Sequence, residues 1–436
     1  MKTIRAEVAV AGGGPAGSAL ARRLALLGFD VVQLARPDAG PRFAESLAPG
    51  VRVHLDTLGI GTPAGRLCTR RVVRWAGEAE QHETDSLIVD RAALDRQLLD
   101  AASAAGVRVV HAGVDSVGHD REWTLHAGGI TVETPFLADA TGRAGLLRRP
   151  RRHASPRTFA VRARWNAVDA PDEMRVAVLP NGWMWGVAAA GGYEIALFAD
   201  RDDLQTAVAE SDLFPFLDRP PDVSHACDAT PFVSLEPVTE DSILAGDAVC
   251  AIDPLSSSGV QAALGSAITA GVIINTMLTR PGSRDAAMQF YAADVTRRFE
   301  RHAGWTGAHY ASAAADSPFW RARAIETAGR AQPAFPPPDA LLAVHPDAVQ
   351  ERPVIRGDLI ALQRVVHTPA GDDVAFLGGI ELAPLVDAMV EVMPDGLTAA
   401  ELLQRWPQGV LQWLVTNEVV YTASTSRTAL TEGAKK

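Results

Sequence analysis

The sequence predicts an α/β protein with a Rossmann-like nucleotide-binding domain, an inserted antiparallel sheet and a small C-terminal α+β module of winged-helix-like type. Three observations support this class. An apolar run at 6–11 leads through GGGPAG into the helical pattern SALARRLALLG and then into a second apolar run, DVVQLA. Residues 158–200 alternate polar and apolar side chains in short runs, as antiparallel strands do. The proline-rich stretch at 331–339 precedes a separate acidic segment.

The glycine turn is the first element with a chemical implication. Gly12, Gly14 and Gly17, with Pro15 and Ala16 between them, stand between a strand and a helix. In this context the glycines allow a tight turn and a close approach of the backbone to a pyrophosphate, which is bound at the helix N-terminus. The turn therefore predicts a dinucleotide site.

The domain order follows from these patterns. We expect a discontinuous nucleotide-binding domain at 1–155 plus 236–330, with the inserted sheet of a substrate domain at 156–235. A proline-rich linker at 331–339 then leads to the C-terminal module at 340–436. Residues 340–434 hold 12 Asp and Glu against 5 Arg, which argues against DNA binding. A docking role and a simple packing role both stay open for this module.

Composition excludes several classes. The net charge of −11 argues against nucleic-acid partners and against docking on an anionic membrane. Residues 254–279 carry no charge but contain polar residues and glycines, which favours a buried helix over a membrane span. The three cysteines are far apart and predict neither a disulfide framework nor a metal site. No secretion signal is visible, so the cytoplasm is the expected compartment.

Further motifs reveal a family resemblance. GGGPAG, Asp90-Arg91, DATG at 139–142 and GDAVCAIDPLSSSG at 246–259 resemble, in order and spacing, the motifs of FAD monooxygenases of the p-hydroxybenzoate hydroxylase fold. FAESLAP at 43–49, the GWMWG segment and SPFW at 317–320 are similar to the halogenase branch of that superfamily. The resemblance covers about residues 1–330 and implies FAD as the cofactor.

The resemblance also implies roles for single residues. Asp247 is expected to accept hydrogen bonds from the ribityl hydroxyls, and the helix N-terminus at Gly259 and Val260 is expected to face the flavin pyrimidine edge. Asp253 is the candidate catalytic carboxylate, with loop bracing as the alternative. The expected cofactor-binding residues are Gly12, Gly14, Pro15, Ala16, Gly17, Arg36, Glu45, Ser46, Arg91, Val114, Gly246, Asp247, Pro254, Gly259 and Val260.

One position departs from the family pattern. The second strand of such proteins usually ends in an acid that binds the adenosine ribose, and here Ala35 occupies that position. The neighbouring Arg36 is expected to stack on the adenine or to reach a phosphate. Asp90 is expected to cap the helix that follows it.

The halogenase resemblance fails at one chemical requirement. Halogenases of this type use a lysine beside the substrate, but the only lysines here are Lys2, Lys435 and Lys436. Arginine does not replace it, because a guanidinium does not deprotonate to a nucleophile. We therefore predict aromatic hydroxylation through a flavin C4a-hydroperoxide, with Trp183 and Trp185 lining the substrate site or packing between sheet and flavin domain. No second dinucleotide motif is present, so electrons are expected from transiently bound nicotinamide or a separate reductase.

The substrate class is open at this point. A halogenase-like body without the lysine and with an added C-terminal module resembles flavoproteins that mature peptidyl quinone cofactors such as cysteine tryptophylquinone. This implies hydroxylation of a peptidyl tryptophan, with a protein or peptide as partner. The alternatives are a tailoring hydroxylase of a small or carrier-bound aromatic metabolite, a geranylgeranyl-reductase-type flavoprotein and a non-enzymatic flavin-binding assembly protein.

Overall fold

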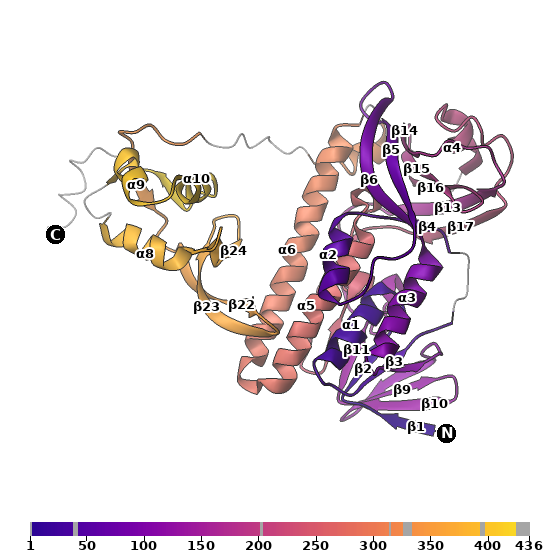
Figure 1. The fold of residues 1–436 in the computed structure, drawn as a ribbon, viewed down its shortest axis with the longest axis horizontal. Helices are drawn as coiled ribbons and strands as arrows, with labels where there is room; N and C mark the ends of the chain where they lie inside the picture. Colours follow the sequence, from indigo (N-terminus) through magenta and orange to yellow (C-terminus); the bar gives the residue numbers. More distant parts are fainter. Residues whose placement is uncertain are drawn as a thin grey trace. The chain divides into compact units, whose positions relative to one another are not determined.

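The computed structural model describes residues 2–37, 42–200, 204–313, 315–325, 334–392 and 397–423 (Figure 1). The chain forms two compact units, Met1–Glu326 and Thr327–Lys436. The mixed α/β architecture confirms the predicted fold class. Of the predicted linker, residues 331–333 lie outside the described part of the chain.

A parallel five-stranded sheet of order β19-β11-β2-β3-β7 forms the nucleotide-binding part of the first unit. Its central strands are mostly apolar and fully buried, as expected for a parallel sheet covered on both faces. β19 comes from beyond the inserted sheet and pairs with β11, which makes this part of the chain discontinuous. The strands are β2 (Val8–Ala11), β3 (Val31–Leu34), β7 (Arg108–Val110), β11 (Phe136–Asp139) and β19 (Ser242–Leu244).

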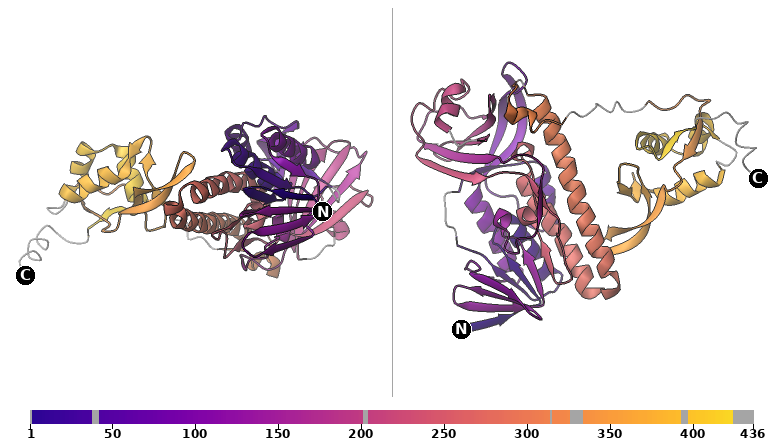
Figure 2. Two further views of the ribbon diagram at one scale, coloured as in Figure 1. Left: turned by 90° about the horizontal axis from the view of Figure 1, so that it is seen from below. Right: turned by 180° about the vertical axis from the view of Figure 1, so that it is seen from behind.

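The helices of this part pack on one another as well as on the sheet. α1 (Pro15–Leu26) contacts both α3 (Arg91–Ala104) and α5 (Gly259–Thr279), and α5 also contacts α2 (Gly50–Thr57) and α6 (Arg284–Ala311). Figure 2 shows α5 and α6 running side by side. α5 is long and apolar enough to cross a membrane, but 67% of its most apolar window is buried inside the protein. This burial agrees with the buried helix that the sequence predicts.

A second, smaller sheet lies next to the N-terminus. It has the order β1-β10-β9-β8, and Trp123, Leu125 and Val132 from it share an apolar core with β2 and β3. Its strands are β1 (Lys2–Arg5), β8 (Ser116–His119), β9 (Trp123–Ala127) and β10 (Ile130–Thr134). It therefore covers one end of the nucleotide-binding sheet (Figure 1).

The third sheet of the first unit has eight strands in the order β17-β13-β16-β15-β14-β5-β6-β4. Three of its strands come from residues 44–90, a range that the sequence predicts to belong to the nucleotide-binding domain. They join through the parallel pairing of β5 with β14, a long-range contact that local alternation does not reveal. The strands are β4 (Ala44–Leu47), β5 (Arg66–Arg74), β6 (Glu80–Asp90), β13 (Phe159–Asn166), β14 (Met174–Leu179), β15 (Gly182–Ala189), β16 (Gly192–Ala199) and β17 (Val223–Asp228).

The remaining elements of the first unit are short. β12, β18 and β20 form a three-stranded sheet, and α7 follows α6. Their bounds, with α4 and the 3-10 turns used below, are β12 (Arg151–His153), β18 (Phe232–Ser234), β20 (Cys250–Ala251), α4 (Leu204–Glu210), α7 (Pro318–Arg321), η1 (Gly142–Ala144), η2 (Gly246–Ala248) and η3 (Pro254–Ser256).

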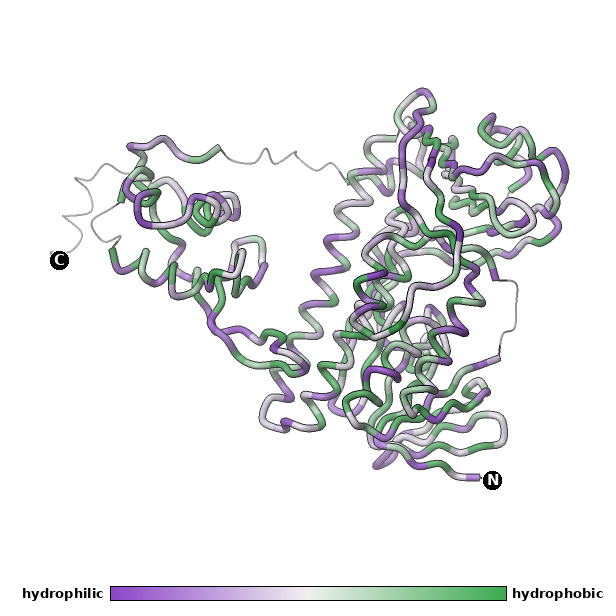
Figure 3. The backbone as a smooth tube through the Cα atoms, viewed as in Figure 1, coloured by the Kyte–Doolittle hydropathy of each residue, from purple (hydrophilic) through white to green (hydrophobic). Residues whose placement is uncertain are grey.

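The C-terminal unit has its own apolar core, which includes Val366, Val386, Leu402 and Leu414. Along the tube in Figure 3, apolar and polar residues alternate in its helices, as expected when one face packs on the core. Its elements are β21 (Leu341–Val344), β22 (Val349–Arg356), β23 (Leu359–His367), β24 (Asp373–Val374), β25 (Phe376–Leu377), β26 (Ile380–Glu381), α8 (Leu382–Val392), β27 (Leu397–Thr398), α9 (Ala399–Arg405), α10 (Gln408–Thr416) and β28 (Val420–Thr422).

Candidate active site

The glycine turn has the geometry of a phosphate site. Gly12 adopts φ +126°, and a Cβ on it would lie 2.2 Å from the carbonyl oxygen of Ala140. A Cβ on Gly17 would lie 2.2 Å from the carbonyl oxygen of Gly12. Gly14 is different, because it is the N-cap of α1, makes no side-chain cap bond, and has open space where a Cβ would be. The first N–H groups of α1, which starts at Pro15, are therefore available to an anionic ligand.

The GD segment lies directly against this turn. β19 pairs with β11, and the chain then enters η2, where Gly246 adopts φ +62°. A Cβ on Gly246 would lie 2.5 Å from the Cβ of Ala16, so the two segments are in contact. The Asp247 carboxylate accepts no hydrogen bond from any residue that the structure describes. Burial raises its pKa, and Arg143 and Arg91 partly oppose this effect. A desolvated carboxylate without donors fits a ligand that brings hydroxyl groups.

Arg91 interacts electrostatically with the Asp247 carboxylate and donates a hydrogen bond to Glu45 of β4. Its Nε donates to Asp95 Oδ1 at 2.8 Å and its Nη1 to Glu45 Oε2 at 3.4 Å. Burial opposes the charge of Arg91, but Asp95, Glu45 and Asp247 outweigh it, so its pKa is raised. Asp90 accepts from the Ala93 N–H at 2.7 Å, which confirms the predicted helix cap. Ser46 follows Glu45 on β4 and pairs in register with Ile88.

The adenosine side of the site departs from the family as expected. Ala35 is buried, and a Cβ built on Gly13 would lie 2.7 Å from the Cβ of Ala35, so the glycine turn packs directly against this position. Arg36 is exposed, and its side chain lies 3.2 Å from the Cβ position of Gly113, next to Val114. Arg36 and Val114 therefore lie together at the carboxyl ends of β3 and β7, where open parallel sheets bind ligands.

The DPLSSSG loop forms the other side of the site. Asp253 is the N-cap of η3, and its Oδ1 accepts from the Leu255 N–H at 2.9 Å. Pro254 is half-buried at the first position of η3, and Val260 is buried. Ser258 makes no side-chain cap for α5, and the Cβ position of Gly259 faces open space. The N-terminus of α5 is therefore a second helix end available to a ligand.

Asp253 is also part of a buried hydrogen-bond chain. The Tyr310 hydroxyl lies 3.1 Å from Asp253 Oδ1 and 3.2 Å from Oδ2, and it accepts from Trp183 Nε1 at 3.3 Å. Asp253 is 5% exposed and Tyr310 is 4% exposed. Burial raises the pKa of Asp253, opposed by the Leu255 and Tyr310 hydrogen bonds and by Arg323 and Arg143. Burial, and then the charge of Asp253, raises the pKa of Tyr310. The loop-bracing alternative for Asp253 is thus realised in the structure.

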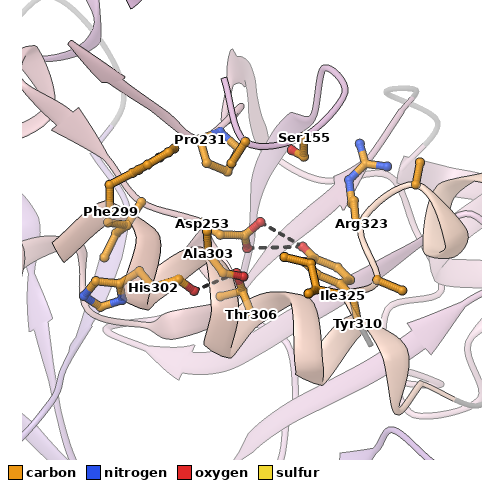
Figure 4. Close-up of a pocket in the computed structure, with 14 residues that line it drawn as sticks. Ser155, Pro231, Asp253, Phe299, His302, Ala303, Thr306, Tyr310, Arg323 and Ile325 are labelled. Carbon is orange, nitrogen blue, oxygen red and sulfur yellow. Dashed lines mark hydrogen bonds between the residues drawn. The ribbon is translucent and has the colours of Figure 1, made fainter. Parts of the chain in front are cut away.

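A pocket lies beside Asp253 and Tyr310, and its empty volume of about 470 Å³ includes space open to solvent (Figure 4). Asp253 and Tyr310 line it together with His302 and Arg323. The Arg323 guanidinium is buried and donates to Asp200 Oδ1 at 2.8 Å. Burial lowers the pKa of the half-buried His302. The pocket combines a carboxyl group, a phenol and a guanidinium with apolar walls, as ligand pockets commonly do.

The two tryptophans share one face of β15, as their spacing predicts. Trp183 is 3% exposed and stacks on Phe198 with ring centroids 4.2 Å apart. Trp75 contacts both Trp183 and Trp320 edge to face, at 6.3 Å and 5.5 Å between centroids. Trp183 is therefore packed among aromatic rings, while Trp185 is only partly buried.

Sequence reasoning missed Tyr310, Arg323 and Trp75. A signal for Tyr310 was present, because Phe299, Thr306 and Tyr310 recur at helical spacing and are all buried on α6. On the same helix, Glu300 is exposed and pairs with Arg152.

A glycine turn, a GD carboxylate and two free helix N-termini converge between a parallel sheet and a large mixed sheet, which is the arrangement of a flavin-dependent oxidoreductase. The tryptophan halogenase family matches residues 64–333, and the chain belongs to this family. The protein is a FAD-dependent oxidative enzyme.

Individual relatives add detail. The tryptophan 2-halogenase of Chondromyces crocatus is 28% identical in an alignment 371 positions long, which covers 73% of this chain and 70% of the relative. The structure is similar to the peptidyl tryptophan dihydroxylase QhpG, essential for tryptophylquinone cofactor biogenesis, with TM-score 0.77 and 28% identity over 95% of this chain and 99% of the other. The flavin-dependent halogenase CmlS has TM-score 0.78 at 20% identity, over 97% of each chain, which supports the fold.

Proposed function

We propose that the protein is a FAD-dependent monooxygenase that hydroxylates the indole ring of a peptidyl tryptophan, and that it does not halogenate through a lysine. The observation that carries the proposal is the absence of lysine between Lys2 and Lys435. Lys2 lies in β1 of the small sheet, away from the strands of the large sheet. An arginine at the site keeps its proton and cannot form the nucleophilic amine that the halogenase mechanism uses.

The similarity to QhpG supports the peptidyl substrate. That similarity extends over 95% of this chain, so it includes the C-terminal unit. A folded protein substrate needs a docking surface, and we assign this task to the C-terminal unit. The physiological compartment in this proposal is the cytoplasm, and the electrons come from transiently bound nicotinamide or a separate reductase.

In this proposal, different residues of the site have different roles. Bound and reduced FAD supplies the electrons and activates dioxygen. Gly14 and the α1 N-terminus hold its pyrophosphate, and Asp247 holds its ribityl chain. The aromatic residues around Trp183 exclude water from the reacting face, because they are packed against the η3 loop. Asp253 is the carboxyl group that exchanges a proton beside the reacting ring.

The test is a single-turnover reaction of the reduced protein with ¹⁸O₂ in the presence of chloride and bromide. The substrates are a tryptophan-containing quinohemoprotein subunit, free tryptophan and a simple phenol, each analysed by mass spectrometry. We expect labelled oxygen in the tryptophan of the protein substrate and no halogen in any product. A halogenated product would contradict the proposal.

The same reaction separates the alternatives. Labelled oxygen in the phenol or in free tryptophan, but not in the protein substrate, favours a tailoring hydroxylase. Oxidation of the reduced flavin by an isoprenoid substrate under nitrogen, without oxygen uptake, favours a reductase of the geranylgeranyl type.

A further inference from the structure

The indole N–H groups of Trp183 and Trp185 differ in their hydrogen bonding, although the two side chains share one face of β15. Trp183 Nε1 donates to the Tyr310 hydroxyl at 3.3 Å. Trp185 Nε1 is buried from solvent and has no acceptor among the residues that the structure describes. A buried N–H without an acceptor destabilises the folded state, so it indicates an acceptor that arrives from outside the chain.

The position of Trp185 indicates which ligand brings that acceptor. Its ring packs against one apolar cluster that contains Ala44 of β4 and Ile88 of β6. It also packs against the cluster of Trp183, to which Leu255 of η3 contributes. β4 continues into Glu45, which bonds Arg91, and η3 is the loop after Asp253. Trp185 is therefore packed between the two segments that flank the predicted flavin ring.

Another buried group on the same sheet provides a contrast. The Tyr193 hydroxyl on β16 also has no partner among the described residues. It lies in the cluster with Met184 and Phe214, and Met184 points to the face of β15 opposite to Trp183 and Trp185. Tyr193 is thus in a closed core, whereas the Trp185 N–H combines the missing acceptor with a place beside the candidate cofactor segments.

We propose that the Trp185 indole N–H donates a hydrogen bond to an acceptor atom on the edge of the bound isoalloxazine ring. The Trp-x-Trp pair then has two separate tasks. Trp183 orients the Tyr310 hydroxyl toward Asp253, and Trp185 contacts the cofactor. This assignment depends on FAD binding alone and holds whether the enzyme hydroxylates or halogenates its substrate.

The test compares Trp185→Phe with Trp183→Phe in the FAD-loaded full-length protein. For Trp185→Phe we expect about fivefold weaker FAD binding, the effect of one lost neutral hydrogen bond. We also expect a shift of a flavin carbonyl or ring-nitrogen band in isotope-edited Raman spectra. Trp183→Phe is expected to keep the wild-type flavin bands and to bind FAD within about twofold of wild type.

Two results would overturn the assignment. One is a Trp185→Phe protein whose flavin bands and FAD affinity equal those of wild type. The other is an equal change in both variants, which would indicate loss of packing instead of loss of a donor. If Trp185→Phe does not fold, benzothienylalanine at position 185 keeps the ring shape and replaces only the N–H by sulfur. A shift of the flavin Raman bands in that protein supports the assignment, and unchanged flavin bands overturn it.

Discussion

The hydroxyl of Tyr310 offers the sharpest test of the buried network. Tyr310→Phe removes the hydroxyl that lies 3.1 Å and 3.2 Å from the Asp253 oxygens and that accepts from Trp183 Nε1 at 3.3 Å. The hydrogen bond to a buried carboxylate contributes about 1.5–3 kcal/mol, and the stranded Trp183 N–H adds a penalty of about 1 kcal/mol. We expect the free energy of unfolding to fall by about 2–4 kcal/mol at neutral pH.

The free energy of unfolding that Tyr310→Phe loses should also depend on pH, and the raised pKa of Asp253 determines the direction of this dependence. Burial raises the pKa of Asp253 in the folded protein, so the folded state holds this proton at pH values where the unfolded chain has released it. The contribution of Asp253 to stability is therefore fully present below its unfolded pKa and is lost as the pH rises through its folded pKa. The Tyr310 hydroxyl opposes that loss, because it stabilises the ionised carboxylate. Removing it raises the folded pKa further, so the deficit of the variant grows with pH.

Tyr291→Phe is the matched control. Tyr291 is also buried, but its hydroxyl donates to the uncharged carbonyl oxygen of Leu244 at 2.6 Å. Its loss should cost about 1 kcal/mol, equally at about pH 5 and about pH 8. Urea unfolding followed by tryptophan fluorescence at both pH values measures the two variants side by side. Equal, pH-independent losses in Tyr310→Phe and Tyr291→Phe would refute the reasoning.

The other predictions concern the cofactor and the C-terminal unit. Gly14→Ala should leave the fold intact and weaken FAD binding at least about tenfold, because the added Cβ enters the open space at the α1 N-terminus where the ligand is expected. Gly17→Ala should instead lower the melting temperature of the apoprotein, because the added Cβ collides with the Gly12 carbonyl oxygen. Asp247→Asn should weaken FAD binding about tenfold in a fluorescence titration and leave apoprotein stability unchanged or higher, since the partly buried carboxylate lacks donors among the described residues. Unchanged affinity would contradict its role. Leu362 is 57% exposed on β23 of the C-terminal unit, to which we assign substrate docking, and we propose that it contacts the protein substrate. Leu362→Ser should therefore raise the KM for a protein substrate several-fold and leave FAD affinity unchanged, and an unchanged KM would exclude Leu362 from the docking surface.

The sequence by itself determined the local elements and the cofactor. The opening strand, turn and helix are specified by neighbouring residues, because the periods of strand and helix and the glycine conformations act over a few positions. The GD pair and the Asp253 loop were identified from their resemblance to family motifs, and the structure brings Gly246 into contact with Ala16 of the glycine turn. The absence of an internal lysine is likewise a property of the sequence alone.

Only the tertiary structure decided what depends on contacts between distant segments. Local alternation does not say that β5 pairs with β14, because many strands expose suitable edges and only packing of the whole sheet selects the partner. It does not bring the Tyr310 hydroxyl, 57 positions away in the chain, to the Asp253 carboxylate. Nor does it distinguish Trp183 from Trp185, because contacts with distant segments decide which ring is fully buried and which N–H meets the Tyr310 hydroxyl.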